Sequence, residues 1–408
     1  MKRRSRWFPI TTAASALMLL AAACGGGGDG GGGGGGAVEK IPVTIYFQGA
    51  LSGPVNYLVI PSFQAAQVRF DELNADESFP AKITFIEGDT QGDPANAPQI
   101  VEQAVSDPET VAIHGPAFSG ESAASGDTYN DAAIPFVTAS ATATSLREEG
   151  WDYWYRAVGN DQGQGALVGQ YLVDVLKAKS VFVSHDKSEY GQPLAETARD
   201  TAEEGGAEIA GLEGITTGEE DFSALISAFE ASGADSFYFG GYDADFGKIV
   251  KQARDSGLQI PMMSSDGSLS STFIDLAGGG ADNVHLSAPT NISGAFIDKY
   301  NQEVGGEASS VPVYAAEGYD VASMIGEGIK QAIEEGAEDP ESIREGIKQY
   351  MDSLTVDSPY EGVAKPYAFD ENHEVTAKNP ESLYHFYEVN GGEVKPLGSA
   401  PEVLGGGG

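Results

Sequence analysis

Five short polar stretches share one property: each follows a short apolar run, where a parallel strand would end and a loop would begin. Hydroxyl, glycine and tyrosine residues dominate these stretches, which are Leu51–Pro54, Phe118–Gly120, Ser140–Thr142, His185–Gly191 and Phe239–Tyr242. Open α/β sheets bind small molecules outside the carboxyl ends of their strands. Such residues suit gripping a small polar ligand and do little chemistry unaided, so the pattern favours a binding protein.

An enzyme is the main competing class, and the residues that it would need are missing. Catalysis requires a nucleophile, a base and an orienting group within reach of one another. None of the five histidines lies at metal-ligand spacing from another, and the chain has a single cysteine. The segment nearest to a Gly-x-Ser-x-Gly elbow, Gly120–Ala124, lacks the final glycine. We therefore expect no catalytic residue, no metal and no cofactor.

Strand and helix patterns alternate along the chain, which is typical of a parallel α/β architecture. The expected strands are Val43–Phe47, Ile83–Ile86, Val111–Ile113, Ile134–Val137, Ser180–Ser184, Glu208–Leu212, Asp235–Phe239, Ile260–Met263 and Val284–Leu286. Apolar residues at helical spacing follow the first strand, and Asp93–Pro94 is a helix N-cap with proline behind it. The alternation starts over at Tyr153–Gly159. Two successive units of similar size predict two Rossmann-like lobes, each with a parallel central sheet.

The last third of the chain has a different pattern. Helices are expected at about Ile292–Val304, Tyr314–Glu335 and Ser342–Met351, followed by a β-rich tail that ends at Val389. A chain that returns to the first lobe here and then leaves it again crosses between lobes three times. That predicts a hinge of several strands and a cleft between the lobes. The expected lobes are 41–159 plus 287–378 and 160–286 plus 379–403, with a flexible tail at 404–408.

The N-terminus has the features of a targeting segment. Four basic residues precede the apolar run Ala13–Ala23, which is too short to span a bilayer. The run ends in small residues before Cys24, as in the lipobox of bacterial lipoproteins, although Ala21 stands where leucine is usual. We expect a signal peptide at 1–23, a lipidated Cys24, and a flexible glycine-rich tether up to residue 40. A phosphate-binding glycine loop would need a strand before it and a helix after it, and neither pattern is present.

The charge of the chain excludes some partners. Its formal net charge is −38, and without the four basic residues of the targeting segment it is −42. Nucleic-acid phosphates demand lysine and arginine, so we expect no nucleic-acid partner and no flat contact with anionic lipid. Solubility is a simpler explanation of the acidity than a specific cationic partner.

Taken in order, the motifs resemble those of one family. The chain is similar to type I periplasmic binding proteins, specifically the leucine/isoleucine/valine-binding proteins of branched-chain amino-acid ABC transporters. The shared pieces are Leu51–Pro54, Asp71–Asn74, Asp89, Asp93–Pro94, the hydroxyl loops at Ser119 and Thr142, His185–Gly191, Gly218–Leu225, Gly240–Tyr242, Tyr314 and Tyr319–Asp320. Each motif alone is weak, whereas their order and spacing together are specific, and they cover nearly everything after the tether.

The resemblance implies a site for the ligand's α-carboxylate. In the family it is held by a serine after the third strand and by a Ser/Ala-x-Thr loop after the fourth, which implies Ser119 and the loop Ser140, Ala141 and Thr142 here. Hydroxyls and free N–H groups at helix starts do stabilise an anion. The alternative is that Ser119 and Thr142 only cap their own helices.

The resemblance also implies tyrosines that close over the ligand and an acidic residue that binds its α-ammonium group. Tyr190 and Tyr242 match tyrosines that close over the ligand, although a lone tyrosine after a strand is usually amphipathic packing. Asp266 stands where the family places an acidic residue, often glutamate, on the α-ammonium group. The alternative is a turn residue, since Ser264–Gly267 is good turn chemistry. We expect replacement of Asp266 by alanine or asparagine barely to alter folding, as turn aspartates contribute little.

Specificity for the ligand's side chain in the family rests on an aromatic near the Ser-Gly-Pro loop and on the residue before the loop serine. These positions are Tyr57 or Leu58, and Phe118. Some members carry a disulfide at the Phe118 position, with a partner near Gln91. Neither residue is cysteine here, so that disulfide is absent.

The combined reading is an exported, lipid-anchored, monomeric binding protein of the cell envelope that delivers an amino acid to an ABC transporter permease. An aliphatic, branched-chain amino acid is the expected ligand. The alternatives left open are the same fold binding urea, a short amide or a small aromatic acid, and a purely structural surface protein. A carboxylate at Asp266 facing the cleft favours an ammonium group, which a neutral amide lacks.

Overall fold

The computed structural model describes residues 40–304 and 311–405. The expected signal peptide, Cys24 and most of the glycine-rich tether lie outside the described residues. No helix in these two described ranges has both the length and the apolar character that crossing a bilayer demands.

The first sheet has five parallel strands in the order β2-β1-β3-β4-β5. They are β1 (Ile41–Gly49), β2 (Ala81–Asp89), β3 (Thr110–His114), β4 (Phe136–Thr138) and β5 (Trp154–Arg156). Ile45 packs on the side of helices α1 (Ile60–Ala75), α10 (Ala315–Glu334) and α11 (Pro340–Ser353), and its neighbour Tyr46 packs on the side of α2 (Ala97–Ser106) and α3 (Ser119–Asp131). Because helices cover both faces, β1 is buried almost continuously from Val43 onward.

The second sheet has seven strands in the order β15-β14-β10-β9-β8-β6-β7. Its parallel members are β6 (Ser180–His185), β7 (Glu208–Gly214), β8 (Ser236–Gly240), β9 (Met262–Ser264) and β10 (Val284–Ala288), and β14 (His385–Asn390) and β15 (Glu393–Ser399) add an antiparallel edge. Val181 packs with helices α4 (Asp161–Asp174) and α5 (Gly191–Glu204), whereas Phe182 packs with α6 (Ser223–Ser232), α7 (Asp243–Asp255) and α8 (Ser271–Ala277).

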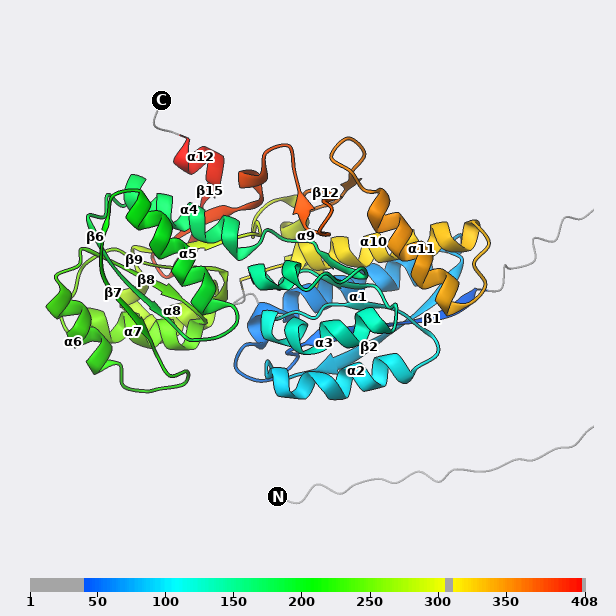
Figure 1. Cartoon of the computed structure of the whole chain (residues 1–408), viewed down its shortest axis with the longest axis horizontal. Coiled ribbons are helices and arrows are strands. Elements are labelled where there is room, and N and C mark those ends of the chain that lie inside the picture. Colours follow the sequence, from blue (N-terminus) through cyan, green and yellow to red (C-terminus); the bar gives the residue numbers. More distant parts are fainter. Residues whose placement is uncertain (1–39, 305–310, 406–408) are drawn as a thin grey trace, which may run out of the picture. The chain divides into compact units, whose positions relative to one another are not determined.

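Three connections join the two sheets (Figure 1). The chain passes from β5 to α4, returns between β10 and α9 (Ala295–Glu303), and passes again between β13 (Val375–Thr376) and β14. Strand β13 belongs to a small antiparallel sheet with β11 (Tyr360–Glu361) and β12 (Pro366–Phe369). Single turns of 3-10 helix complete the described chain, at η1 (Asn56–Leu58), η2 (Pro94–Asn96), η3 (Thr144–Glu148), η4 (Asp266–Ser268), η5 (Gly278–Ala281) and η6 (Pro380–Leu383).

Buried polar contacts tie the third connection to the first. The Arg156 guanidinium donates to both carboxylate oxygens of Glu374, with Nη2 to Oε1 at 2.6 Å. Asn160 Nδ2 also donates to Glu374, at 2.9 Å. The ring of Tyr384 then lies so close to Gly163 that a Cβ there would meet the hydroxyl at 2.2 Å. The start of α4 and the third connection therefore touch directly, and there is no room for a side chain at Gly163.

The α/β fold class with two parallel-sheet lobes and three crossings is confirmed. Asp93 does cap a helical turn, since its carboxylate accepts from the Ala95 N–H at 2.9 Å. The strand β5 (Trp154–Arg156) lies within the Tyr153–Gly159 stretch and closes the first sheet, and the second sheet starts with β6. The β-rich tail runs beyond Val389 to Ser399 and is followed by α12 (Ala400–Leu404). The residue boundaries of the two lobes stay a prediction.

Candidate ligand-binding site

A small cavity lies at the carboxyl ends of strands from both sheets. Its lining residues come from the loops after β1, β3 and β4 on one side and after β6, β8 and β9 on the other, and they are Leu58, Ala117, Phe118, Ser119, Ser140, Thr142, Tyr190, Tyr242 and Asp266. The cavity volume is about 10 Å³, which is room for about one water molecule. The side chains thus nearly fill the space between the two sets of loops.

The first-sheet side of the cavity is built around the N-terminus of α3. Ser119 is the first residue of this helix, and its hydroxyl accepts from the Ala143 N–H at 3.1 Å instead of capping the helix. The Ser140 hydroxyl donates to the Ala117 carbonyl at 2.8 Å, which fixes the two loops together. A helix start presents N–H groups that have no partner within the helix. This side therefore offers hydrogen-bond donors and the positive end of a helix dipole.

Aromatic rings form the opposite side. The ring of Tyr242 lies 5.4 Å from that of Tyr190 and 6.1 Å from that of Phe118, centroid to centroid, in tilted and edge-on arrangements. Such pairs add packing energy beyond the area that they bury. Phe118 and Tyr242 belong to different sheets, so this contact also joins the two halves of the site.

Asp266 is buried and fully hydrogen-bonded, which is not how an exposed turn residue behaves. Only 2% of it is exposed. Its Oδ1 accepts from the Tyr190 hydroxyl at 2.9 Å and from Gln164 Nε2 at 2.8 Å, and its Oδ2 accepts from the Tyr314 hydroxyl at 2.8 Å. Burial raises the pKa of its carboxyl, and these three hydrogen bonds partly oppose the rise. The expectation that its replacement would barely alter folding is therefore wrong.

A second carboxyl group, that of Asp161, lies close enough to Asp266 for their charges to interact. Asp161 is the first residue of α4 and is 1% exposed, and the Thr142 side chain and the positive charge of Arg156 lie near its carboxyl. Burial, together with the charge of Asp266, raises the pKa of its carboxyl well above the ordinary value.

The charges around the cavity have one sign. No lysine or arginine is among its lining residues. In the described part of the chain, no group of three or more histidine, cysteine, aspartate or glutamate side chains is placed to hold a metal ion. Fixed donors on one side and the Asp266 carboxyl on the other complement a small molecule that carries both a carboxylate and an ammonium group.

The structure places most residues predicted for the site around this cavity, with two exceptions. Ala141 is buried in the core behind the loop and does not line the cavity. Tyr57 lies outside the lining, and its hydroxyl donates to the Gly267 carbonyl at 2.5 Å, which joins the loop after β1 to the loop after β9. Leu58, the other candidate at this position, does line the cavity.

Sequence reasoning missed four residues here: Ala117, Asp161, Gln164 and Tyr314. Asn160–Asp161 has the sequence of an ordinary helix start, and Asn160 does cap α4, so nothing marked Asp161 as a site residue. In the sequence, Tyr314 stands out only as part of a family motif. Its φ of 57° is uncommon for a tyrosine, and this backbone turn carries its hydroxyl to Asp266.

Comparisons with known proteins show the family to which the chain belongs. A family model described as periplasmic binding protein matches residues 42–393. The leucine-specific-binding protein of Salmonella typhimurium is 32% identical over 248 residues, which is 60% of this chain and 67% of that protein. The leucine-, isoleucine-, valine-, threonine- and alanine-binding protein of Pseudomonas aeruginosa is 28% identical over 315 residues, 75% of this chain and 82% of that protein.

A solved structure is similar over most of the chain. The branched-chain amino-acid transporter substrate-binding protein LivJ from Streptococcus pneumoniae, crystallised with isoleucine, aligns with a TM-score of 0.75 and 26% identity, covering 88% of this chain and 98% of that one. The chain belongs to the periplasmic binding protein family.

Proposed function

We propose that this protein binds an amino acid with an aliphatic, branched side chain between its two lobes and delivers it to the permease of an ABC importer. The observation that carries the proposal is the pairing of the α3 N-terminus and its hydroxyls with the buried carboxyl of Asp266 around one cavity. The carboxyl of Asp161 does not line the cavity but lies close enough for its charge to interact with that of Asp266. The names of the relatives, which state leucine and related amino acids, support the same ligand class.

Each part of the ligand has a complementary surface. Its carboxylate is held by Ser119, Thr142 and the N–H groups of the first turn of α3, where the dipole favours an anion. Its ammonium group lies by Asp266 and Asp161, which offer negative charge in a dry environment. Its side chain packs against Leu58, Phe118 and the tyrosine rings.

Ligand entry requires the two lobes to part, because the cavity as it stands is about 10 Å³. Contacts between the lobes support a closed arrangement, including the Tyr57–Gly267 bond next to the cavity and a bond from the Ser145 hydroxyl to Glu189 at 3.0 Å. Opening at the three connections admits the ligand, and closing surrounds it.

A calorimetric panel of leucine and its fragments tests the ligand class. We expect leucine to bind, and both 4-methylpentanoate, which lacks the ammonium group, and 3-methylbutylamine, which lacks the carboxylate, to bind at least about thirtyfold more weakly, as for one partner of a buried charge pair. Tighter binding of urea, 4-methylpentanamide or benzoate than of leucine would instead establish one of the alternative ligands.

We also propose that Cys24 is lipidated and holds the protein at the cell envelope. The small residues before Cys24 and the glycine-rich stretch after it support this. Cys24→Ser should release a soluble protein or leave the precursor unprocessed. Recovery of the matured Cys24→Ser protein in the detergent phase would refute the anchor.

A further inference from the structure

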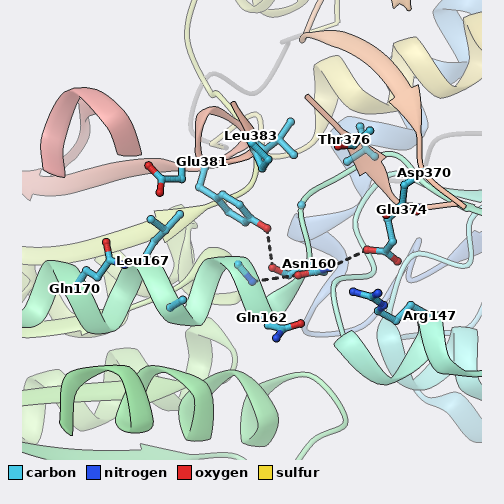
Figure 2. A pocket seen from close by; sticks show the side chains of 16 residues that line it. Arg147, Asn160, Gln162, Leu167, Gln170, Asp370, Glu374, Thr376, Glu381 and Leu383 are labelled. Carbon is cyan, nitrogen blue, oxygen red and sulfur yellow. Dashed lines mark hydrogen bonds between the residues drawn. The ribbon is translucent and has the colours of Figure 1, made fainter. Parts of the chain in front are cut away.

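A larger cavity lies at the hinge and is distinct from the site above (Figure 2). Its volume is about 470 Å³, within the range of small-molecule sites. Three parts of the chain form it: Arg147 from η3, the first connection with the start of α4, and the third connection from Asp370 to Tyr384. We call it the hinge pocket. It shares no lining residue with the cavity at Asp266.

One end of the hinge pocket holds an arginine side chain that has no partner among the described residues. Arg147 is half-buried, its guanidinium points into the pocket toward Asn160 and Glu374, and it makes no hydrogen bond or ion pair with any described residue. Glu374 does not compensate it, because its carboxylate is already engaged by Arg156 from behind. The carboxylate of Asp370, an exposed residue, also lies at this end of the pocket beside Glu374. Two guanidinium groups and two carboxylates balance in formal charge, and Arg147 is the guanidinium that no carboxylate of a described residue engages.

The other end of the hinge pocket is apolar. Leu167 of α4, Val375, Leu383 and the ring of Tyr384 are buried residues that line it. The carboxylates of Asp370 and Glu381 belong to exposed residues of the lining. Water screens exposed charges, and Asp370 Oδ1 already accepts from the N–H groups of Asn372 and Glu374.

A free guanidinium facing an apolar wall is complementary to one class of molecule. We propose that the hinge pocket binds a small aliphatic carboxylate, with its carboxylate on Arg147 and its hydrocarbon chain against Leu167 and Leu383. Arginine suits this role because its planar fork matches a carboxylate with two parallel hydrogen bonds. A fatty-acid fragment and an α-amino acid both have this chemistry, and they differ in whether an ammonium group faces Asp370 and Glu381.

Three six-carbon probes distinguish the sources: hexanoate, norleucine and hexylamine. Binding is followed through the methyl NMR signals of Leu167 and Leu383 in the hinge pocket, with those of Leu58 reporting the other cavity. We expect hexanoate or norleucine, and not hexylamine, to shift the two hinge signals in a saturable way. Saturable shifts with norleucine alone would identify an amino acid as the source, and shifts with hexanoate an unsubstituted acid.

Two variants and a control assign the binding to the hinge pocket. Arg147→Gln should weaken carboxylate binding at least about tenfold through loss of a charge-assisted pair, and Ala166→Leu should weaken it by filling the pocket from α4. Arg199→Gln, an arginine of the α5 surface outside the pocket, should leave the affinity unchanged. The same affinity in the parent and in Arg147→Gln, or shifts confined to Leu58, or none at the hinge signals, would overturn the proposal.

Discussion

Asp266 provides the sharpest test at the scale of single residues. Removing one partner of a buried charge pair costs about 2–5 kcal/mol, so Asp266→Ala should weaken amino-acid binding roughly thirty- to several-thousand-fold by titration calorimetry. The same change leaves the Tyr190 and Tyr314 hydroxyls without their acceptor, at about 1–3 kcal/mol of stability each. Asp266→Asn keeps the shape and should fold better while still binding poorly.

A matched control for this prediction is Asp275→Ala, because Asp275 is an exposed aspartate on α8. It should alter neither affinity nor stability. If Asp266→Asn folds and binds leucine within about threefold of the parent, the amino-acid assignment loses its main physical support.

Glu121 should make stability depend on pH. It is fully buried near the start of α3, Thr90 donates to one of its oxygens, and the other oxygen has no partner. Burial raises the pKa of this carboxyl to about 8. The folded protein therefore keeps a proton that the unfolded chain releases near pH 4.5, so the stability that this proton contributes is lost as pH rises toward 8.

The expected slope is a loss of about 1.4 kcal/mol of unfolding free energy per pH unit between pH 6.5 and 8, measured by urea unfolding. Glu121→Gln, which cannot ionise, should flatten this slope, and Glu102→Gln on the exposed face of α2 should not. Equal slopes in the parent and in Glu121→Gln would show that Glu121 is ionised in the fold.

At the scale of elements, the Arg156–Glu374 pair holds the third connection against β5. The two side chains are 0% and 6% exposed. Glu374→Gln leaves a buried guanidinium without its counter-charge, which should destabilise by about 3–5 kcal/mol in urea unfolding. Glu371→Gln, an exposed glutamate of the same turn, is the control. Replacing both partners, as Arg156→Met with Glu374→Leu, should recover much of the loss, and no recovery would mean that the pair is needed for more than charge balance.

The elements themselves differ in how far sequence predicts them. Helices cover both faces of the two sheets, so strand segments such as Val181–Val183 are uniformly apolar. Such apolar runs allow most of the strands to be predicted from the sequence. The sequence does not predict strand β15, because β15 is an edge strand that contains charged residues and Pro396. Its strand conformation depends on pairing with β14 and not on its own composition. The sequence does not mark Asp161 and Tyr314 as site residues for a different reason. Both interact with Asp266, which is more than 40 residues away in the sequence.

At the scale of the whole molecule, the three connections predict closure around the ligand. Small-angle scattering should show a smaller radius of gyration with saturating leucine than without it. Tyr57→Phe removes the hydroxyl that bonds to Gly267 across the site, so it should speed ligand dissociation while leaving the fold intact. An unchanged radius on saturation would argue against hinge closure, or would mean that the free protein is already mostly closed.

The neighbouring carboxyls of Asp161 and Asp266 also couple ligand binding to the acidity of the surroundings. Burial raises the pKa of both groups, and an ammonium group brought beside them lowers it again, so each ligand bound expels part of a proton. Affinity must then rise with pH while these groups titrate, and an acidified medium favours unloading of the carrier. The expelled proton is measurable as a binding heat that changes with the ionisation enthalpy of the buffer, and a heat independent of the buffer would exclude the coupling.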